Sequence, residues 1–235
     1  MPLNTAKLIK KTNSTNDVIE LNFETASPLN FKAGQYISIR IDNVEKSAYF
    51  RAYSIATRPE KDGKKFGLCI KVLTDSRGSG WLNSLKKNDK ISFLGPLGDF
   101  TFNENSDKDV IFVATGTGIA PLKAIIEDQL HKNSSRKMTL ILGLRHISGV
   151  FYKEYFEKLT QKYPNFQFTL TLSRPENNSW HGKKGRVTDI LASMKLSPTN
   201  TEFYLCGLKN MIESVGSLLK EKGIKEEDIH FEKYD

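Results

Sequence analysis

The sequence predicts two domains of different class. We expect an antiparallel Greek-key β-barrel over residues 1–102, a polar linker at 103–109, and a doubly wound α/β domain with a parallel sheet over residues 110–235. Three observations support this. Short strand-like runs dominate the first hundred residues, strand-like and helix-like runs alternate in the rest, and a polar segment lies where the pattern changes. The length of 235 residues suits two domains of ordinary size.

The first half consists mainly of short strands. Residues 35–41 alternate between apolar and polar side chains, as a strand with one buried face does. Three further runs are strand-like, at 51–57, 66–73 and 90–94, and only residues 79–87 are expected to form a helix. Turn signals such as Lys61-Asp62-Gly63 separate these runs. Many short strands joined by turns indicate a sandwich or a barrel.

The second half alternates strands with helices. Residues 110–114 are continuously apolar, which is typical of a strand buried on both faces. Further strands are expected at 138–142, 166–172 and 202–206, and helices at 119–131, 152–163, 187–194 and from 211 to a stop at Gly223. This alternation predicts a parallel sheet with helices on both faces.

Composition excludes several classes of protein. The chain has 35 basic and 27 acidic residues, net +8, but the lysines are spread along it, which weakens a nucleic-acid-binding interpretation. No run approaches the ~20 apolar residues of a membrane span, and the start lacks an apolar leader. Cys69 and Cys206 are too few for a disulfide scaffold, an iron–sulfur domain or a cysteine-ligated metal site. We therefore expect a cytoplasmic protein without a metal.

A glycine turn follows the first strand of the second domain. Thr115, Gly116, Thr117 and Gly118 lie between a predicted strand and a predicted helix, at the edge of the sheet where open α/β folds bind ligands. Two glycines allow a close approach to an anion, and the helix start presents free N–H groups. The third glycine of the usual dinucleotide fingerprint is absent, so a plain tight turn is the alternative interpretation.

The acidic residue that usually binds an adenosine ribose is not found. The second strand of this domain leads into Arg145, and the third ends in Ser173 and Arg174. Arginine near a ribose favours a 2′-phosphate, and hence NADPH over NADH. A solvated loop arginine is the alternative.

The tetrapeptide Arg51-Ala52-Tyr53-Ser54 suits a flavin dinucleotide. On a strand, Arg51 and Tyr53 share one face and Ser54 lies on the other. A guanidinium can bind a pyrophosphate, a tyrosine can stack on a flat ring, and a hydroxyl can bond to a ring nitrogen. An ordinary amphipathic strand would show the same alternation.

This tetrapeptide resembles the Arg-x-Tyr-Ser/Thr signature of the ferredoxin–NADP⁺ reductase family. Further matches follow in the order of that family, at residues 32–36, 68–72, 77–82, 95–100, 115–121 and 204–207. The resemblance covers nearly the whole chain and implies an FAD-binding barrel followed by an NAD(P)-binding domain. The implied cofactors are FAD and NADPH, with NADH possible.

The resemblance implies roles for residues of the barrel. Arg51, Ser79 and the Gly78 backbone would hold the FAD pyrophosphate, Tyr53 would lie against the isoalloxazine, and Ser54 would lie near flavin N5 as a catalytic residue. Three more cofactor contacts are implied by position in the matched motifs: Ala52, Lys71 and Gly80. Ser76 stands where the family often has glycine.

The resemblance also implies roles in the second domain. The nicotinamide nucleotide phosphates would meet Thr115, Gly116, Thr117 and Gly118, and Ser173 and Arg174 resemble the family's 2′-phosphate pair, to which the residue argument above adds Arg145 as a cofactor contact. Cys206, followed by Gly207, would lie by the reacting nicotinamide carbon, although a small buried residue would look the same. The tail is similar to a Glu-x-Tyr end, so Glu232 is a candidate for proton traffic and Tyr234 for covering the flavin, although Asp235 extends beyond it.

The implied reaction is hydride transfer from NADPH to flavin N5, followed by single electrons to a small acidic carrier, ferredoxin or flavodoxin. The basic surface would favour that encounter. Two alternatives within enzymes are an NAD(P)H:flavin reductase and a stand-alone reductase component of an oxygenase system. A non-catalytic nucleotide-binding module and a nucleic-acid binder are weaker alternatives. We favour a monomer.

Overall fold

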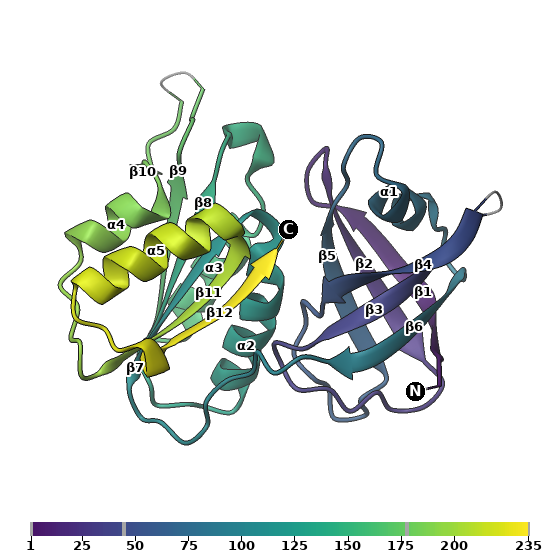
Figure 1. The fold of residues 1–235 in the computed structure, drawn as a ribbon, viewed down its shortest axis with the longest axis horizontal. Coiled ribbons are helices and arrows are strands. Elements are labelled where there is room, and N and C mark those ends of the chain that lie inside the picture. The colour runs from purple at the N-terminus through teal and green to yellow at the C-terminus, as the bar shows by residue number, and fades with distance from the viewer. Residues whose placement is uncertain (1, 44–45, 177–178, 235) are drawn as a thin grey trace. The chain divides into compact units, whose positions relative to one another are not determined.

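The structure is a computed structural model that describes residues 2–43, 46–176 and 179–234. The chain forms two compact units (Figure 1). The first, here called the barrel unit, comprises Met1–Phe102 with Lys123–Asp128, and the second, the α/β unit, comprises Asn103–Leu122 with Gln129–Asp235. The linker and domain limits expected from the sequence stay a prediction.

The barrel unit is one six-stranded antiparallel sheet with the order β4-β3-β6-β1-β2-β5. The strands are β1 (Asn4–Asn13), β2 (Val18–Thr25), β3 (Tyr36–Asn43), β4 (Lys46–Ser54), β5 (Lys65–Lys71) and β6 (Lys90–Leu97). A single helix, α1 (Arg77–Ser84), connects β5 to β6. An antiparallel bridge between Ile55 and Leu68 links the chain just after β4 to β5, and so joins the two edge strands. The predicted barrel class is confirmed.

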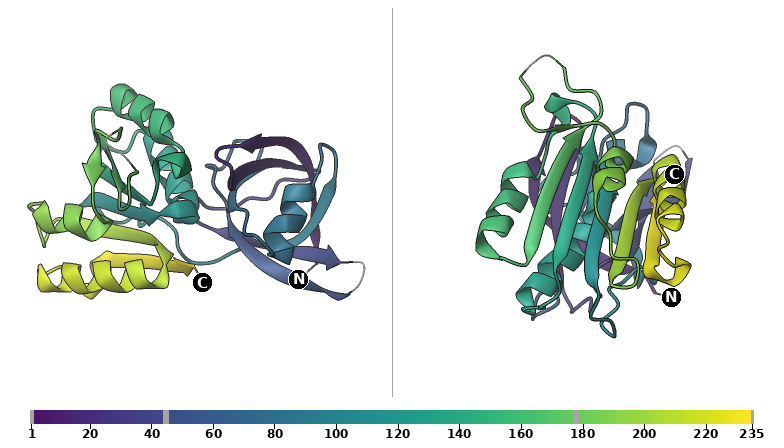
Figure 2. Two further views of the ribbon diagram at one scale, coloured as in Figure 1. Left: turned by 90° about the horizontal axis from the view of Figure 1, so that it is seen from above. Right: turned by 90° about the vertical axis from the view of Figure 1, so that its left-hand side faces the viewer.

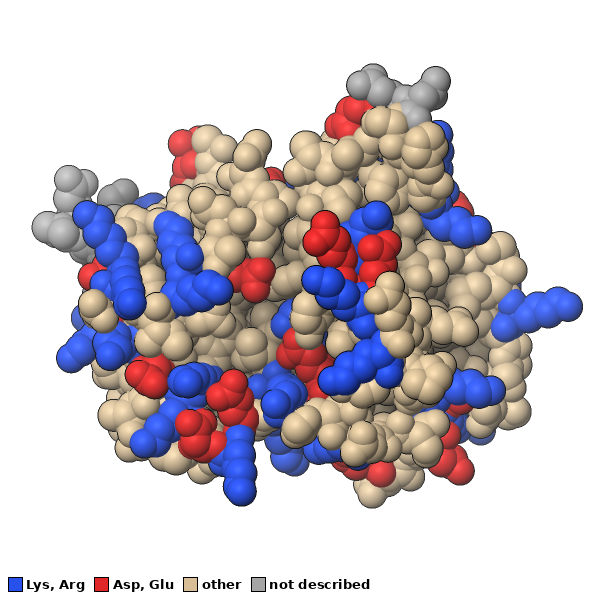
Figure 3. All heavy atoms as spheres, turned by 180° about the vertical axis from the view of Figure 1, so that it is seen from behind, with Lys and Arg blue, Asp and Glu red and all other residues tan. Residues whose placement is uncertain are grey.

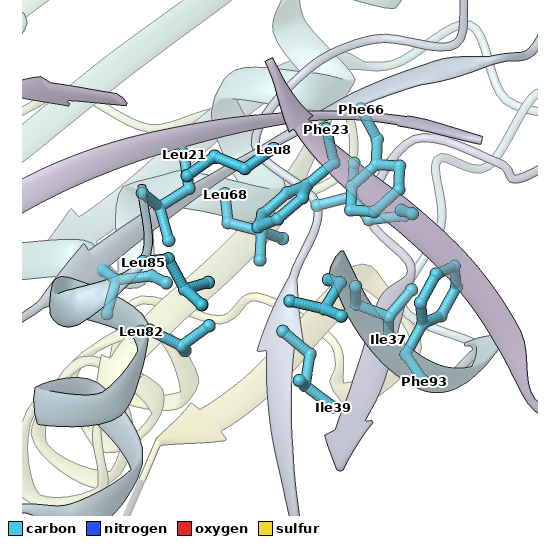
Figure 4. Packing of buried hydrophobic residues seen from close by; sticks show 14 of the residues in the cluster. Leu8, Leu21, Phe23, Ile37, Ile39, Phe66, Leu68, Leu82, Leu85 and Phe93 are labelled. Carbon is cyan, nitrogen blue, oxygen red and sulfur yellow. The ribbon is translucent and has the colours of Figure 1, made fainter. Parts of the chain in front are cut away.

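Alternating apolar side chains fill the barrel. Ile37, Ile39 and Ile41 of β3 are at most 1% exposed, as the period of two in this strand requires. The ring of Phe66 stacks on that of Phe23 at a centroid distance of 5.4 Å and meets that of Phe93 edge to face at 5.5 Å (Figure 4). Leucines of α1 and of the turn after it reach the same core. The helix is therefore fixed on the barrel by its packing.

The α/β unit is a six-stranded parallel sheet with the order β10-β9-β8-β7-β11-β12. Its strands are β7 (Asp109–Thr115), β8 (Met138–Leu144), β9 (Phe166–Leu172), β10 (Lys183–Lys184), β11 (Thr201–Leu208) and β12 (Ile229–Tyr234). Its α-helices are α3 (Lys153–Lys162), α4 (Val187–Ser193), α5 (Lys209–Glu221) and the two ends of α2 (Ile119–His131), whose middle residues Lys123–Asp128 are grouped with the barrel unit. Short 3₁₀ turns are η1 (Gly116–Gly118), η2 (Ile147–Gly149) and η3 (Glu226–Asp228). The predicted α/β class is confirmed.

Helices cover both faces of this sheet. Helices α4 and α5 pack over one face around Phe203, Leu205 and Val215, and α2 and α3 lie on the other (Figures 1 and 2). Gly223 follows α5 with a φ of +82°, the conformation in which glycine commonly ends a helix, as predicted. No helix among the described residues is long and apolar enough to cross a membrane.

The strand order creates a switch point at β7. From β7 the chain proceeds outward through β8 and β9, and then returns to form β11 on the other side of β7. The turns that follow β7 and β11 therefore leave the carboxyl edge of the sheet side by side in opposite directions. In open α/β folds, ligands bind at this point.

A buried polar network lies at the opposite, amino-terminal edge of the sheet. The guanidinium of Arg136 donates to Glu202 Oε2 at 2.6 Å, to the carbonyl oxygen of Asn103 at 3.0 Å and to that of Lys108. Asn103 donates in turn from its side chain to Glu202 at 3.0 Å and from its backbone to the Tyr204 hydroxyl at 2.8 Å. Burial is the largest influence on Tyr204 and raises its pKa to about 12. Residues 103–108 are thus bonded to the α/β sheet.

Candidate functional site

The barrel unit brings the end of β4 against the start of α1. A methyl group built on Gly78 would lie 3.2 Å from the Tyr53 hydroxyl, 3.4 Å from Arg51 Cγ and 3.5 Å from the Tyr49 hydroxyl. Gly78 is therefore a neighbour of Arg51 and Tyr53, which lie 27 and 25 residues before it in another motif. Any larger residue at position 78 would fill the space between strand and helix.

Two serines fix the first turn of α1. Ser76 caps the helix by accepting a hydrogen bond from the Ser79 backbone N–H at 3.4 Å. The Ser79 hydroxyl is buried and accepts from the Leu73 N–H at 3.0 Å. The glycine expected at position 76 is thus replaced by a capping residue, which suits a helix start. Gly80 is half-buried, and a Cβ there would meet nothing within 4 Å.

This part of the barrel unit carries cations and a neutral phenol. Arg51 is exposed, and its guanidinium carbon lies 4.5 Å from the centre of the Tyr49 ring, with that of Arg77 5.0 Å from the same ring. Burial, and then Tyr49, raise the pKa of Tyr53 to about 12, with Arg51 opposing the shift. Tyr53 is therefore an uncharged ring at neutral pH. Two guanidiniums beside a helix start can bind an anion.

The other barrel residues expected at the site have different surroundings. Ser54 is 6% exposed at the end of β4, opposite Tyr36 of β3. Ala52 is exposed on β4. Lys71 pairs with Asp17 at 3.2 Å, and both side chains are about half exposed. The pKa of Asp17 is lowered because its bonds with Thr15 and Lys71 outweigh its burial, the largest single influence. Lys71 thus already has an anionic partner.

In the α/β unit, the glycine turn packs against the end of β11. A Cβ on Gly118 would lie 2.4 Å from the carbonyl oxygen of Cys206, and one on Gly207 would lie 2.3 Å from Thr115 Oγ1. Gly116 has a φ of +55° and open space around its missing side chain. These glycines allow the turns after β7 and β11 to touch at the switch point. Gly116 and Thr117 are partly exposed and remain accessible to a ligand phosphate, whereas Gly118 is buried.

A buried hydroxyl in this turn lacks a bonding partner. Thr115 Oγ1 is inaccessible to solvent and has no hydrogen-bond partner among the described residues. A buried polar atom without a partner is costly, so native proteins rarely leave one unless a ligand or water bonds to it. The hydroxyl is therefore a candidate for bonding to a ligand bound at this turn. Thr117 is half-exposed in the same turn.

The structure brings Cys206 together with two residues of β12. Glu232 is the register partner of Cys206, and Tyr234 lies two residues further along the strand. Cys206 is fully buried, and its thiol pKa is raised well above its usual value, first by burial and then by Glu232; bonds with Tyr234 and the Gly207 backbone oppose the shift. The thiol is therefore neutral. Packing of Tyr234 on a flavin stays a prediction.

The residues expected at a 2′-phosphate lie together at the ends of β8 and β9. The Arg174 N–H donates to the Arg145 carbonyl at 2.8 Å, and the Ser173 N–H donates to the Leu144 carbonyl at 3.0 Å. All three expected side chains, those of Arg145, Ser173 and Arg174, are exposed. Two cationic side chains are thus available to an anion beside a serine hydroxyl.

The sequence did not reveal an acidic residue at this edge. Glu176 pairs with His146 and accepts from the Ile147 N–H at 3.1 Å. Hydrogen bonds from its own backbone N–H and from Ile147 lower the pKa of Glu176, so the carboxylate is ionised at neutral pH. Glu176 lies two residues after Arg174 in a loop without periodic pattern, and its contact with His146 is made only by the fold.

Comparison with protein families matches both units. Residues 5–102 match the oxidoreductase FAD-binding domain, and residues 112–217 match the oxidoreductase NAD-binding domain. The chain is 37% identical over 193 residues to one component of the Na⁺-translocating NADH-quinone reductase of Marinomonas sp. (strain MWYL1), covering 76% of this chain and 47% of that protein. It is 33% identical over 212 residues to the same component of the Pseudomonas aeruginosa (strain UCBPP-PA14) enzyme, covering 85% and 51%. The chain spans about half the length of the curated relatives it matches.

Solved structures share the fold. The Amycolatopsis cytochrome P450 reductase GcoB is similar with a TM-score of 0.89 and 26% identity, covering 99% of this chain and 70% of that one. A ferredoxin NADP⁺ reductase from Neisseria gonorrhoeae with bound FAD and NADP has a TM-score of 0.86 at 21% identity, covering 99% of both chains. Together these matches account for both units.

Proposed function

Because the chain belongs to the ferredoxin–NADP⁺ reductase family, whose oxidoreductases bind FAD and a nicotinamide dinucleotide, we propose that it carries electrons from NADPH through FAD to a separate one-electron acceptor. One observation supports the proposal most strongly. Each unit has a site suited to a diphosphate: the guanidiniums beside α1 in the barrel unit, and the open glycine turn with the unpartnered Thr115 hydroxyl in the α/β unit.

The barrel residues would bind and orient the flavin. FAD, when bound, supplies the chemistry of accepting a hydride and releasing electrons one at a time. Arg51, Ser79 and the Gly78 amide would hold its pyrophosphate, and the neutral ring of Tyr53 would lie against its heterocycle. The Ser54 hydroxyl would bond near the reacting nitrogen and stabilise charge that develops there.

The α/β residues would hold the nicotinamide nucleotide. The turn from Thr115 to Gly118 would bind its phosphates, and the neutral thiol of Cys206 would face the nicotinamide ring. Because the thiol is uncharged, it would pack beside the ring without electrostatic repulsion of the negatively charged hydride. Glu232, which raises the pKa of that thiol, is proposed to hold a proton beside it.

For the donor, we propose NADPH with NADH also accepted. Arg145, Ser173 and Arg174 support recognition of a 2′-phosphate. The ionised Glu176 and the relatives whose name specifies NADH support use of the unphosphorylated nucleotide.

Replacing Arg174 with alanine is expected to raise KM for NADPH about tenfold to a hundredfold, which corresponds to losing one hydrogen bond between charged groups. KM for NADH should change less than about twofold, because NADH lacks the phosphate that the guanidinium would bind. Steady-state kinetics with both nucleotides measures this. Lys195→Ala removes one exposed charge after the end of α4 and is the control. Equal effects on both nucleotides would refute the 2′-phosphate role.

For the acceptor, we propose a small acidic carrier such as ferredoxin or flavodoxin. The net charge of +8 supports attraction of an acidic partner. Figure 3 shows lysine and arginine side chains spread over one face with acidic residues between them, which favours a transient encounter over a tight basic site. A second candidate is the reductase component of a larger assembly. The similarity to a component of a quinone reductase and to the reductase GcoB favours it.

The proposed function is tested by anaerobic reduction of FAD-loaded protein. We expect the purified protein to bind FAD, to lose its yellow colour on addition of NADPH, and to regain it when ferredoxin or flavodoxin is added, more slowly at high salt. Parallel reactions with free FMN, a quinone and a haem protein distinguish the acceptors. A protein that refuses FAD, or whose bound FAD no nicotinamide nucleotide reduces, would contradict the proposal.

A further inference from the structure

We propose that Arg77 is a second cation of the FAD pyrophosphate site and that Tyr49 is the residue that positions it beside Arg51. The inference rests on the proposed binding of FAD by the barrel unit. It adds two residues to which the family resemblance gave no role.

The Tyr49 ring contacts two guanidiniums, one from β4 and one from α1. The guanidinium carbon of Arg51 lies 4.5 Å from the ring centre and that of Arg77 5.0 Å. Both distances are inside the roughly 6 Å range of cation–π attraction. Arg51 is two residues along β4 from Tyr49 and shares its face, whereas Arg77 is the first residue of α1. One ring therefore links the strand and the helix that form the site.

The ring itself is held in place. Tyr49 packs against the barrel core, and its hydroxyl lies 3.5 Å from the position that a Cβ on Gly78 would take. It thus occupies the gap beside the first turn of α1, where the absence of a side chain on Gly78 leaves room.

The charges at this place favour a dianion. Among the ion pairs formed by the described residues, none includes Arg51 or Arg77. Two nearby like charges repel one another, and the negative face of an aromatic ring offsets part of that repulsion. A pyrophosphate carries two negative charges, and each guanidinium can bind one phosphate through two parallel hydrogen bonds.

Lysine could not substitute for Arg77 in this arrangement. A planar guanidinium can stack on the tyrosine and still present donors at its edge to a phosphate oxygen. An ammonium is a compact charge that would satisfy one of these contacts at a time. We therefore infer that Arg77 has a geometric as well as an electrostatic role.

The experiment is a titration of apoprotein with FAD and, separately, with riboflavin, which has the same ring but no phosphate. Arg77→Met is expected to raise the Kd for FAD about tenfold, the effect of one hydrogen bond between charged groups. The Kd for riboflavin should not change. The dependence of FAD affinity on salt should also become shallower, because one cation has left the site. Lys86→Met removes an exposed charge from the same unit and serves as the matched control.

Tyr49 is tested by two substitutions. Tyr49→Leu is expected to weaken FAD binding about threefold to tenfold through loss of the cation–π contacts, again with riboflavin unaffected. Tyr49→Phe keeps the ring and should recover most of that loss. In the double variant Tyr49→Leu/Arg77→Met, the two effects should combine to less than their product, since each substitution removes the contact between Tyr49 and Arg77.

The outcomes separate this inference from the proposed function. If the wild-type protein binds no FAD, the proposed function and the inference are both wrong. If the wild type binds FAD and Arg77→Met binds it as Lys86→Met does, only the inference is wrong. If Tyr49→Leu weakens riboflavin as much as FAD, the ring has a purely structural role and its positioning role is refuted.

Discussion

Replacing Gly118 with alanine is expected to weaken binding of the nicotinamide nucleotide about tenfold to a hundredfold. The new Cβ would lie 2.4 Å from the carbonyl oxygen of Cys206 and 2.6 Å from its carbonyl carbon. These are backbone atoms of a central strand, so they cannot move aside as the end of a flexible side chain would. The turn after β7 must shift instead, at a cost of about 1–3 kcal/mol, and its N–H groups then no longer point at the phosphates.

Gly216→Ala is the matched control in the same unit. A Cβ on Gly216 meets nothing within 4 Å, and the residue lies inside α5. Alanine there should stabilise the protein by about 1 kcal/mol, because glycine is the poorer helix former. Titration with NADPH and urea unfolding of both variants measure the two effects. Wild-type affinity in Gly118→Ala would show that the turn does not bind the nucleotide through this geometry.

Replacing Arg136 with methionine is expected to lower the free energy of unfolding of the α/β unit by about 3–5 kcal/mol. The side chains of Arg136 and Glu202 are 7% and 3% exposed, and their charged atoms are 2.6 Å apart. Without the guanidinium, the Glu202 carboxylate stays buried and unpaired by a cation. The carbonyl groups of Asn103 and Lys108 lose a donor as well.

A surface pair provides the comparison for this variant. Lys225 and Glu227 are 3.3 Å apart, but both side chains are about two-thirds exposed, so Lys225→Met should change stability by less than about 0.5 kcal/mol. The double variant Arg136→Met/Glu202→Met should recover part of the loss, since it removes the unpaired charge. Urea unfolding followed by a probe of the α/β unit measures all three. Equal stability of Arg136→Met and Lys225→Met would contradict this expectation.

The sequence predicts the α/β unit more completely than the barrel. Helix α2 and strand β9 have the predicted limits because each has a strong apolar pattern. Strand β1 was not predicted, since Ala6 and Leu8 are its only fully buried residues and a bulge interrupts its register after Leu8. Strand β10 has two residues and is defined by its pairing with β9 alone. Such elements depend on their neighbours for their existence.

For the candidate site, sequence motifs identify some residues, whereas the contacts between them depend on the fold. Motifs named Gly118 and Gly207 as site residues, because glycine is required where another backbone or side chain leaves no room for a Cβ. That Gly118 touches Cys206 is a property of the sheet order and could not be read from the chain. Tyr49 and Glu176 were missed for the same reason. The contact of Tyr49 with Arg77 joins two elements and that of Glu176 with His146 joins two turns, and no local pattern encodes either contact.

The hydrogen bonds of Arg136 bear on how this chain can be cut and recombined. A fragment that starts at Val110 would lack Asn103 and Lys108. Arg136 would then lose two carbonyl acceptors, and the Tyr204 hydroxyl would lose the backbone N–H that donates to it. The boundary for a chimaera, or for separate expression of the α/β unit, should therefore be placed before Asn103. Residues 103–109 have the polar composition of a linker, but removing them would delete hydrogen bonds that stabilise the amino-terminal edge of the α/β sheet.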